Sequence, residues 1–167
     1  MIQNAQSYAS ECHANCNHRY DEHPYAFHLA MVAEAATALS KDYDTAIRER
    51  IVAAAWCHDL IEDARETYND VKKVLGVEVA EIVYALTNEK GRTRSERANS
   101  KYYEGIKATP YATLVKVCDR IANVRHSRDK GSRMYETYAA EYPNFKAKLY
   151  EPGQYEAAWQ MLTSLLP

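Results

Sequence analysis

Few residues in this sequence interrupt helices or cross-link a fold. Its 167 residues include 5 glycines and 5 prolines, whereas alanine is abundant. So few helix breakers among so many alanines favour helices that pack closely together. The four cysteines are too few and too scattered for a disulfide framework, which points to a reducing compartment. They are Cys12, Cys16, Cys57 and Cys118.

The sequence also lacks a long apolar run, a targeting segment and an excess of charge. No run approaches the roughly 20 apolar residues that a membrane-spanning helix needs. The N-terminus, MIQNAQSYASECH, has neither a basic start nor an apolar centre, so it is unlike a signal peptide. With 21 basic and 23 acidic residues, the chain has no overall positive field to attract nucleic acid. We therefore expect a cytoplasmic protein that binds neither membranes nor nucleic acids.

Basic residues are nevertheless concentrated in two segments, 88–101 and 120–133. The first segment has five basic residues against two acidic ones, and the second has five against one. Two short basic segments on a nearly neutral protein suit a small polyanion better than a long nucleic acid. The alternative is that both segments are ordinary charged surfaces in contact with water.

Apolar periodicity and turn residues predict an all-helical fold, with residues 1–167 in one compact domain. Pro24 can open a helix, and Gly76 separates two short apolar-periodic runs. We find no convincing strand pattern, because the apolar run 114–118 continues at helical spacing beyond its end. The expected helices cover residues 3–17, 25–40, 44–63, 67–75, 77–87, 93–107, 110–127, 133–149 and 154–165.

The segment WCHDLIED, residues 56–63, is the most informative part of the sequence. Four ionisable residues, His58, Asp59, Glu62 and Asp63, close a strongly apolar helix, where charge is unfavourable unless something compensates it. A divalent cation would compensate the carboxylates and would also lower the pKa of a bound water. A mixed imidazole and carboxylate set suits manganese, zinc or iron, and many oxygen ligands favour manganese. Alone, however, the segment fits a solvated helix end better than a metal site.

Two distant segments change this interpretation. His28 ends the segment PYAFH at the start of an expected helix, and Asp119 lies in VKVCDRIANVR with Asn123 on the same helix face. Separately, His28 would be read as a core histidine and Asp119 as an ion-paired acid. Together with His58 and Asp59, the order His, His-Asp, Asp resembles the HD superfamily of metal phosphohydrolases.

The finer pattern resembles the hydrolase domain of the RelA/SpoT family, in particular its stand-alone small alarmone hydrolases. The resemblance covers about two thirds of the chain, from Ala9 to Arg125, through PYAFH, HDLIED, GVEVA followed by ALT, and VKVCDRIANVR. It implies an HD-domain helical bundle with one divalent metal ion, expected to be Mn²⁺. The implied activity is removal of the 3′ pyrophosphate of (p)ppGpp, a small-molecule nucleotide.

The resemblance also implies roles for individual residues. The implied metal ligands are His28, His58, Asp59 and Asp119. The acidic pair that activates the attacking water corresponds to Glu62 and Asp63. The implied substrate-binding residues are Arg19, Arg120, Asn123, Lys90 and Arg97. Leu29, Ala64 and Asn88 stand where the family usually has Pro, Thr and Lys, which leaves the preferred base and substrate open.

Several alternatives stay open. The same metal site would serve an HD phosphohydrolase of another nucleotide, such as a deoxynucleotide or the ribose phosphate of NADPH. A nucleotide-binding module without turnover is less favoured, because it has no need of Glu62 and Asp63. Self-association into a homo-oligomer is open. A second metal site at Cys12, His13, Cys16, His18 and His23 is disfavoured, since no second cysteine pair follows at zinc-finger spacing.

Overall fold

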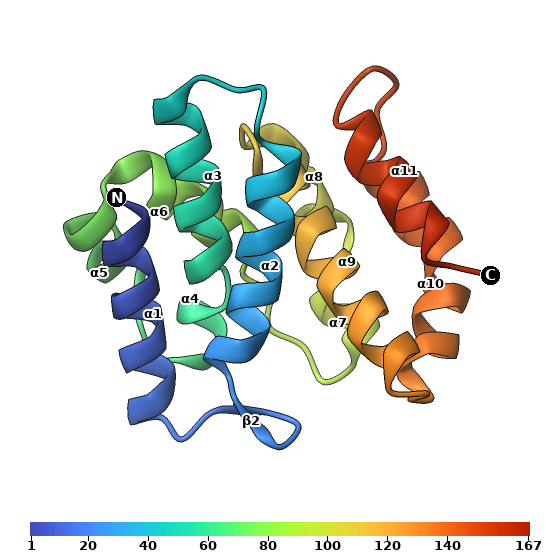
Figure 1. The fold of residues 1–167 in the computed structure, drawn as a ribbon, viewed down its shortest axis with the longest axis horizontal. Coiled ribbons are helices and arrows are strands. Elements are labelled where there is room, and N and C mark those ends of the chain that lie inside the picture. Colours follow the sequence, from blue (N-terminus) through green and yellow to red (C-terminus); the bar gives the residue numbers. More distant parts are fainter.

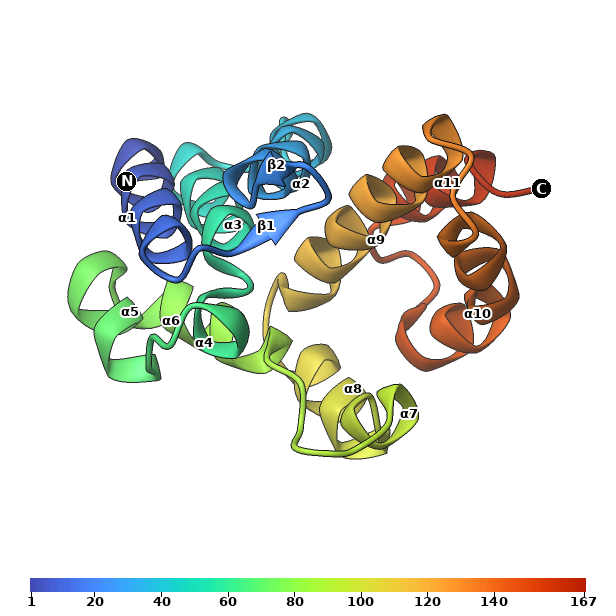
Figure 2. The same ribbon diagram turned by 90° about the horizontal axis from the view of Figure 1, so that it is seen from below.

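The structure, a computed structural model, describes the backbone of residues 1–167 and every side chain except that of Ser95. Over these residues the chain forms helices and one small antiparallel hairpin (Figures 1 and 2). The helices are α1 (Ile2–Asn15), α2 (Ala26–Leu39), α3 (Thr45–Cys57), α4 (Leu60–Asp63), α5 (Tyr68–Leu75), α6 (Val77–Leu86), α7 (Arg94–Arg97), α8 (Ser100–Ala108), α9 (Ala112–Asp129), α10 (Met134–Leu149) and α11 (Glu156–Ser164). The predicted all-helical class is therefore confirmed.

Helices α1, α3, α2 and α9 stand side by side in that order (Figure 1). Helices α10 and α11 pack against α9 at the far end of this row. Figure 2 shows α4 to α8 gathered along one side of the row. Because α2 packs against both α3 and α9, residues that are distant in sequence meet around its first turns.

Helix α3 lies at the centre of the core. All of residues 51–57 are buried, and α1, α2, α6 and α9 pack around the helix. A helix that is buried on every side must be apolar on every side, as IVAAAWC is. Its small alanines allow the neighbouring helices to approach closely.

The predicted helix 44–63 is wrong in one respect, because it breaks between α3 and α4. The backbone of Asp59 has φ −103° and ψ 4°, outside the α-helical region. His58 Nδ1 donates a hydrogen bond to the Ala55 carbonyl at 2.8 Å, and such local side-chain bonds compete with helical ones. The apolar pattern gave no sign of this break. It turns His58 and Asp59 toward α2.

The predicted helix 93–107 is also two helices. Thr93 caps the short α7, and the side chain of Asn99 caps α8 by accepting a hydrogen bond from the Tyr102 backbone N–H at 3.1 Å. An asparagine that bonds the backbone in this way favours a new helix start over a continuous helix. The break separates two groups of pocket residues, one on each helix.

The hairpin between α1 and α2 was not predicted. Strands β1 (Arg19–Tyr20) and β2 (His23–Pro24) pair with Tyr20 opposite His23, and Asp21 between them has φ 51°. Strands of two residues are too short to show an alternating pattern. The hairpin places Tyr20 beside the first turn of α2, where its ring stacks on His28 at 4.7 Å.

The extent of the core bears on domain organisation. One cluster of buried residues runs from Ala5 to Leu165 and includes side chains from both ends of the chain. This supports a single domain over residues 1–167, which stays a prediction. None of the described helices has both the length and the apolar composition needed to cross a bilayer.

Candidate active site

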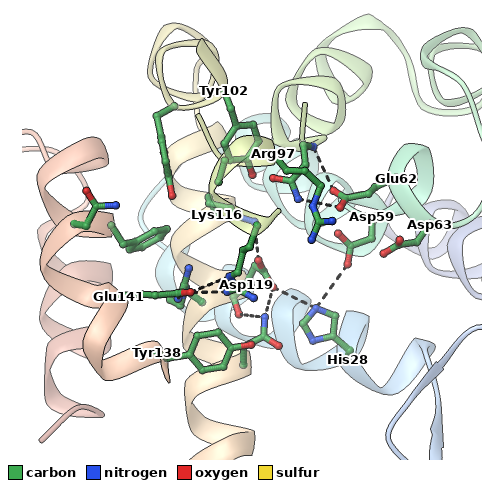
Figure 3. Close-up of a pocket in the computed structure, with 18 of the residues that line it drawn as sticks. His28, Asp59, Glu62, Asp63, Arg97, Tyr102, Lys116, Asp119, Tyr138 and Glu141 are labelled. Carbon is green, nitrogen blue, oxygen red and sulfur yellow. Dashed lines mark hydrogen bonds and ion pairs between the residues drawn. The ribbon is translucent and has the colours of Figure 1, made fainter. Parts of the chain in front are cut away.

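A pocket of about 550 Å³ opens between α9 and the helices α4, α7, α8 and α10. Side chains from these helices, from the start of α2 and from the connecting segments line it. Figure 3 shows the carboxylates of Asp59, Glu62 and Asp63 along one side and Glu141 and Tyr138 along the opposite side. A volume of this size lies within the range of small-molecule pockets.

Three buried side chains converge at the base of this pocket. His28 Nε2 lies 3.4 Å from His58 Nε2 and 3.3 Å from Asp119 Oδ1, and the separation between His58 Nε2 and Asp119 Oδ1 is 3.7 Å. Within the described residues, this is the one group of three His, Cys, Asp or Glu side chains positioned to share a metal ion. The residues come from α2, the α3–α4 break and α9. The convergence expected from the sequence is present.

Asp59 completes this cluster from the side. Its Oδ2 atom lies 3.0 Å from His58 Nε2 and 3.9 Å from His28 Nε2. The Tyr25 hydroxyl donates a hydrogen bond of 2.5 Å to the same oxygen. Tyr25 belongs to the PYAFH segment, so this segment contributes both a histidine and the hydroxyl that fixes a carboxylate.

The chemistry of these donors fits a divalent metal ion. Because His58 Nδ1 donates to a backbone carbonyl, its Nε2 is the nitrogen left for a ligand, as in many metal-binding histidines. Burial opposes a charge on His58, but Asp59 and Asp119 outweigh it and raise the pKa of His58 to about 10. A proton on this ring therefore supplies positive charge that a metal ion would otherwise supply.

Lys116 supplies a second compensating charge. It lies one helical turn before Asp119 on α9 with a partly buried side chain, and its Nζ atom lies 3.0 Å from Asp119 Oδ2. Burial alone would raise the pKa of Asp119, but Lys116 together with His28 and His58 holds it well below its usual range. Lys116 was not among the site residues predicted from the sequence. Its i,i+3 spacing from Asp119 was a signal that could have found it.

The acidic pair Glu62 and Asp63 lies on α4, next to the cluster. Asn88 fixes Glu62 by donating from its side-chain amide at 2.9 Å and from its backbone N–H at 3.2 Å. Burial and then the charges of Asp59 and Glu62 raise the pKa of Asp63 to about 6. A carboxylate with a pKa near neutrality is suited to accept a proton from water.

The five predicted substrate-binding residues divide into two groups. Asn123, Arg120 and Arg97 line the pocket, and Asn123 Nδ2 donates to Asp119 Oδ1 at 2.6 Å. Arg19 and Lys90 are exposed and are not among the lining residues. The guanidinium of Arg19 turns back onto the hairpin carbonyl of Glu22. The substrate contacts of all five stay predictions.

Other residues that line the pocket were missed. Arg94, Tyr138 and Glu141 form the side opposite the acidic pair, together with Arg120. Arg94 was noted as part of a basic segment, but its partner Glu141 is 47 residues away in sequence. A contact at that separation leaves no local pattern. Only the tertiary packing of α10 brings Glu141 to Arg94 on α7 and to Arg120 on α9.

The N-terminal Cys and His residues, considered above as a second metal site, include two histidines that pack against each other. His13 and His18 face each other, with their Nδ1 atoms 2.9 Å apart, and the His18 ring stacks on Tyr25 at 3.8 Å. They support the ring of Tyr25, whose hydroxyl reaches Asp59. This histidine pair therefore packs behind the candidate metal centre.

Comparisons with known proteins agree with this geometry. A family model described as HD domain matches residues 5–149. The guanosine-3′,5′-bis(diphosphate) 3′-pyrophosphohydrolase MESH1 of Danio rerio is 30% identical over 120 residues, which are 71% of this chain and 64% of that protein. The guanosine-3′,5′-bis(diphosphate) 3′-pyrophosphohydrolase of Aquifex aeolicus is 35% identical over 128 residues, covering 74% of this chain and 17% of that protein. The chain thus spans less than two thirds of the length of either relative.

The fold has a solved counterpart. The structure of a metazoan ortholog of SpoT, described as hydrolysing ppGpp, superposes with a TM-score of 0.78 at 22% sequence identity. The alignment covers 98% of this chain and 92% of that one. The match of the family model over most of the chain, together with the converging His, His-Asp and Asp side chains, shows that this chain belongs to the HD domain family.

Proposed function

We propose that this chain is a metal-dependent phosphohydrolase that removes the 3′ pyrophosphate from (p)ppGpp-type nucleotides. The observation that carries the proposal is the convergence of His28, His58 and Asp119 at the base of a nucleotide-sized pocket. The names of the two relatives described above support the choice of substrate. Bound Mn²⁺, self-association and a cytoplasmic location are further parts of the proposal.

The four predicted ligands, His28, His58, Asp59 and Asp119, would hold one divalent metal ion. When bound, that ion supplies positive charge that polarises a phosphoryl oxygen and makes a water molecule more acidic. Lys116 and Tyr25 keep the carboxylates of Asp119 and Asp59 oriented through the hydrogen bonds described above. The protein thus fixes the donor atoms before the substrate arrives, which limits reorganisation during the reaction.

Asp63 is the proposed proton acceptor. Its pKa of about 6 leaves it mainly ionised at neutral pH, yet basic enough to take a proton from the attacking water. Glu62, held by Asn88, orients that water from the adjacent position. Arg97 and Arg120 line the same pocket and would neutralise charge that gathers on the phosphate oxygens.

The direct test is a panel of nucleotides incubated with the protein and Mn²⁺, with the products identified. The panel contains ppGpp, deoxynucleoside triphosphates and NADPH. The proposal predicts that ppGpp is consumed and that pyrophosphate, rather than orthophosphate, is released. Turnover of another nucleotide alone would assign the site to a different HD phosphohydrolase. Binding of ppGpp without turnover would identify a nucleotide-binding module.

The role of Asp63 can be tested with Asp63→Asn, which removes the acceptor and keeps the shape. General base catalysis contributes about 10²–10⁴-fold, so we expect kcat to fall by at least about 10²-fold. The bound metal should be retained, because Asp63 is not one of the proposed ligands. Asp129→Asn, at an exposed carboxylate outside the pocket, is the matched control and should leave kcat unchanged. Full activity in Asp63→Asn would contradict the assignment.

A further inference from the structure

One side of the pocket carries an ion cluster that joins Arg120 to two residues without a role in the proposed reaction, Arg94 and Glu141. Arg94 on α7 approaches Glu141 on α10, with Nε 2.8 Å from Oε1 and the terminal Nη2 3.1 Å from Oε2. Arg120 on α9 donates from Nη1 to the same Oε2 atom at 2.7 Å. A single carboxylate therefore bridges two guanidinium groups that come from different helices.

The two arginines have supports other than Glu141. The Arg120 guanidinium lies 4.8 Å from the centroid of the Tyr138 ring and 4.5 Å from that of Phe145, and the Arg94 guanidinium lies 5.7 Å from the Tyr138 ring. Cation–π contacts at these distances favour the positions of both groups. Withdrawal of the Glu141 carboxylate would therefore leave two cations side by side over an aromatic surface.

Two adjacent guanidinium groups form an anion site. Arginine binds carboxylate and phosphate through the same planar set of N–H donors, and phosphate brings more charge and more acceptor oxygens. Glu141 and both arginines line the pocket that holds the candidate metal centre. A phosphorylated ligand in this pocket therefore meets a site that a carboxylate of the protein already fills.

We propose that Glu141 is an internal competitor for the anion site formed by Arg94 and Arg120, so that it sets the affinity of the pocket for phosphate groups. The inference deepens the proposed function and rests on it for the identity of the natural ligand. The ligand phosphate displaces the carboxylate of Glu141 from the two arginines. Multiply charged phosphate groups displace it more readily than a singly charged anion does, which makes Glu141 a determinant of specificity.

The test is isothermal titration calorimetry of the full-length, metal-loaded chain with inorganic pyrophosphate, at the same free metal concentration in cell and syringe. Glu141→Gln removes the competing charge and keeps the size of the side chain. We expect pyrophosphate to bind about threefold to tenfold more tightly, as for the loss of a partly exposed ion-pair partner. Glu136→Gln, an exposed position on the same helix, removes an equal charge and should leave the affinity unchanged. Unchanged or weaker binding by Glu141→Gln would overturn the inference.

A double-mutant cycle separates competition from a general effect of net charge. If Glu141 acts through Arg94 as well as through Arg120, part of the gain from Glu141→Gln disappears in the Arg94→Gln background. A gain that persists in full there would also overturn the inference. Arg94→Gln alone should weaken pyrophosphate binding. Because the side chain of Arg94 is exposed, we expect this variant to fold normally. If Glu141→Gln does not fold, this single variant still tests the anion site on which the inference rests, and unchanged pyrophosphate binding by Arg94→Gln would overturn it.

The two proposals fail in different ways. Calorimetry with pyrophosphate measures binding and needs no turnover. Tighter binding by Glu141→Gln in a protein that leaves ppGpp intact would support the anion site and reject the hydrolase. Hydrolysis of ppGpp with unchanged pyrophosphate binding in Glu141→Gln would support the hydrolase and reject the role of Glu141.

Discussion

Asp119 is a buried carboxylate whose charge is balanced from two sides. Lys116 lies on one side, and the two histidines of the cluster lie on the other. A bound metal ion would replace the proton on the histidine cluster and bring a larger positive charge. The amount of stability that Lys116 contributes should therefore depend on whether metal is present.

Lys116→Met tests this dependence. Removing one partner of a buried ion pair costs about 3–5 kcal/mol. Because the Lys116 side chain is partly exposed, we expect a loss at the lower end of that range, about 3 kcal/mol, in the presence of chelator. With saturating Mn²⁺ the loss should be smaller, because the metal ion then compensates Asp119. Urea denaturation with EDTA and with Mn²⁺ measures both values. Lys148→Met, at an exposed position, is the control, and an equal loss in both conditions would contradict the charge-balance explanation.

The burial of His13 should make the stability of the fold depend on pH. Its side chain is 1% exposed, and burial lowers its pKa from 6.5 to about 4 in the folded chain. The unfolded chain therefore binds a proton at this histidine more readily than the folded chain does. The contribution of neutral His13 to the free energy of unfolding is complete above pH 6.5 and is lost as the pH falls toward 4. His13→Phe should make the loss of unfolding free energy between pH 6.5 and 4 smaller by about 2 kcal/mol. Urea titrations at several pH values test this, and parallel pH profiles would contradict it.

At the scale of elements, the break between α7 and α8 is fixed by one cap. The Asn99 side chain accepts the Tyr102 N–H, and Tyr102 is a buried residue that lines the pocket. Loss of an N-cap costs about 0.5–2 kcal/mol, so Asn99→Ala should lower the free energy of unfolding by about 1 kcal/mol. Asn99→Ser keeps a capping oxygen and should recover most of the loss. Equal stability of Asn99→Ala and wild type in urea denaturation would show that this cap does not stabilise α8.

The elements also show which features a sequence can predict. Residues 67–75 and 77–87 were expected as helices, and α5 and α6 occupy almost the same ranges because Gly76 separates two amphipathic runs. The break at Asp59 was not predicted, since the apolar pattern of α3 continues through it. It depends on the hydrogen bond from His58 to Ala55 and on contacts with α2.

At the scale of the molecule, the site follows from how three helices pack. Helix α2 lies between α3 and α9, so His28 meets both the α3–α4 break and Asp119. The order of the motifs predicted this convergence. The resemblance to a known family linked residues that lie far apart in the sequence, which no local pattern could have done. The contact of Glu141 with Arg120 had no such motif and needed the packing of α10 on α9. The candidate metal centre was therefore predictable, and the opposite side of the pocket was not.

The central claim is that side chains distant in sequence hold one metal ion together. The most direct measurement is the amount of Mn²⁺ retained per chain, determined by equilibrium dialysis and elemental analysis. We predict one ion per wild-type chain and loss of that ion in both His28→Gln and Asp119→Asn, with Asp129→Asn as the control that keeps it. Retention of one ion per chain by Asp119→Asn and His28→Gln would contradict the account.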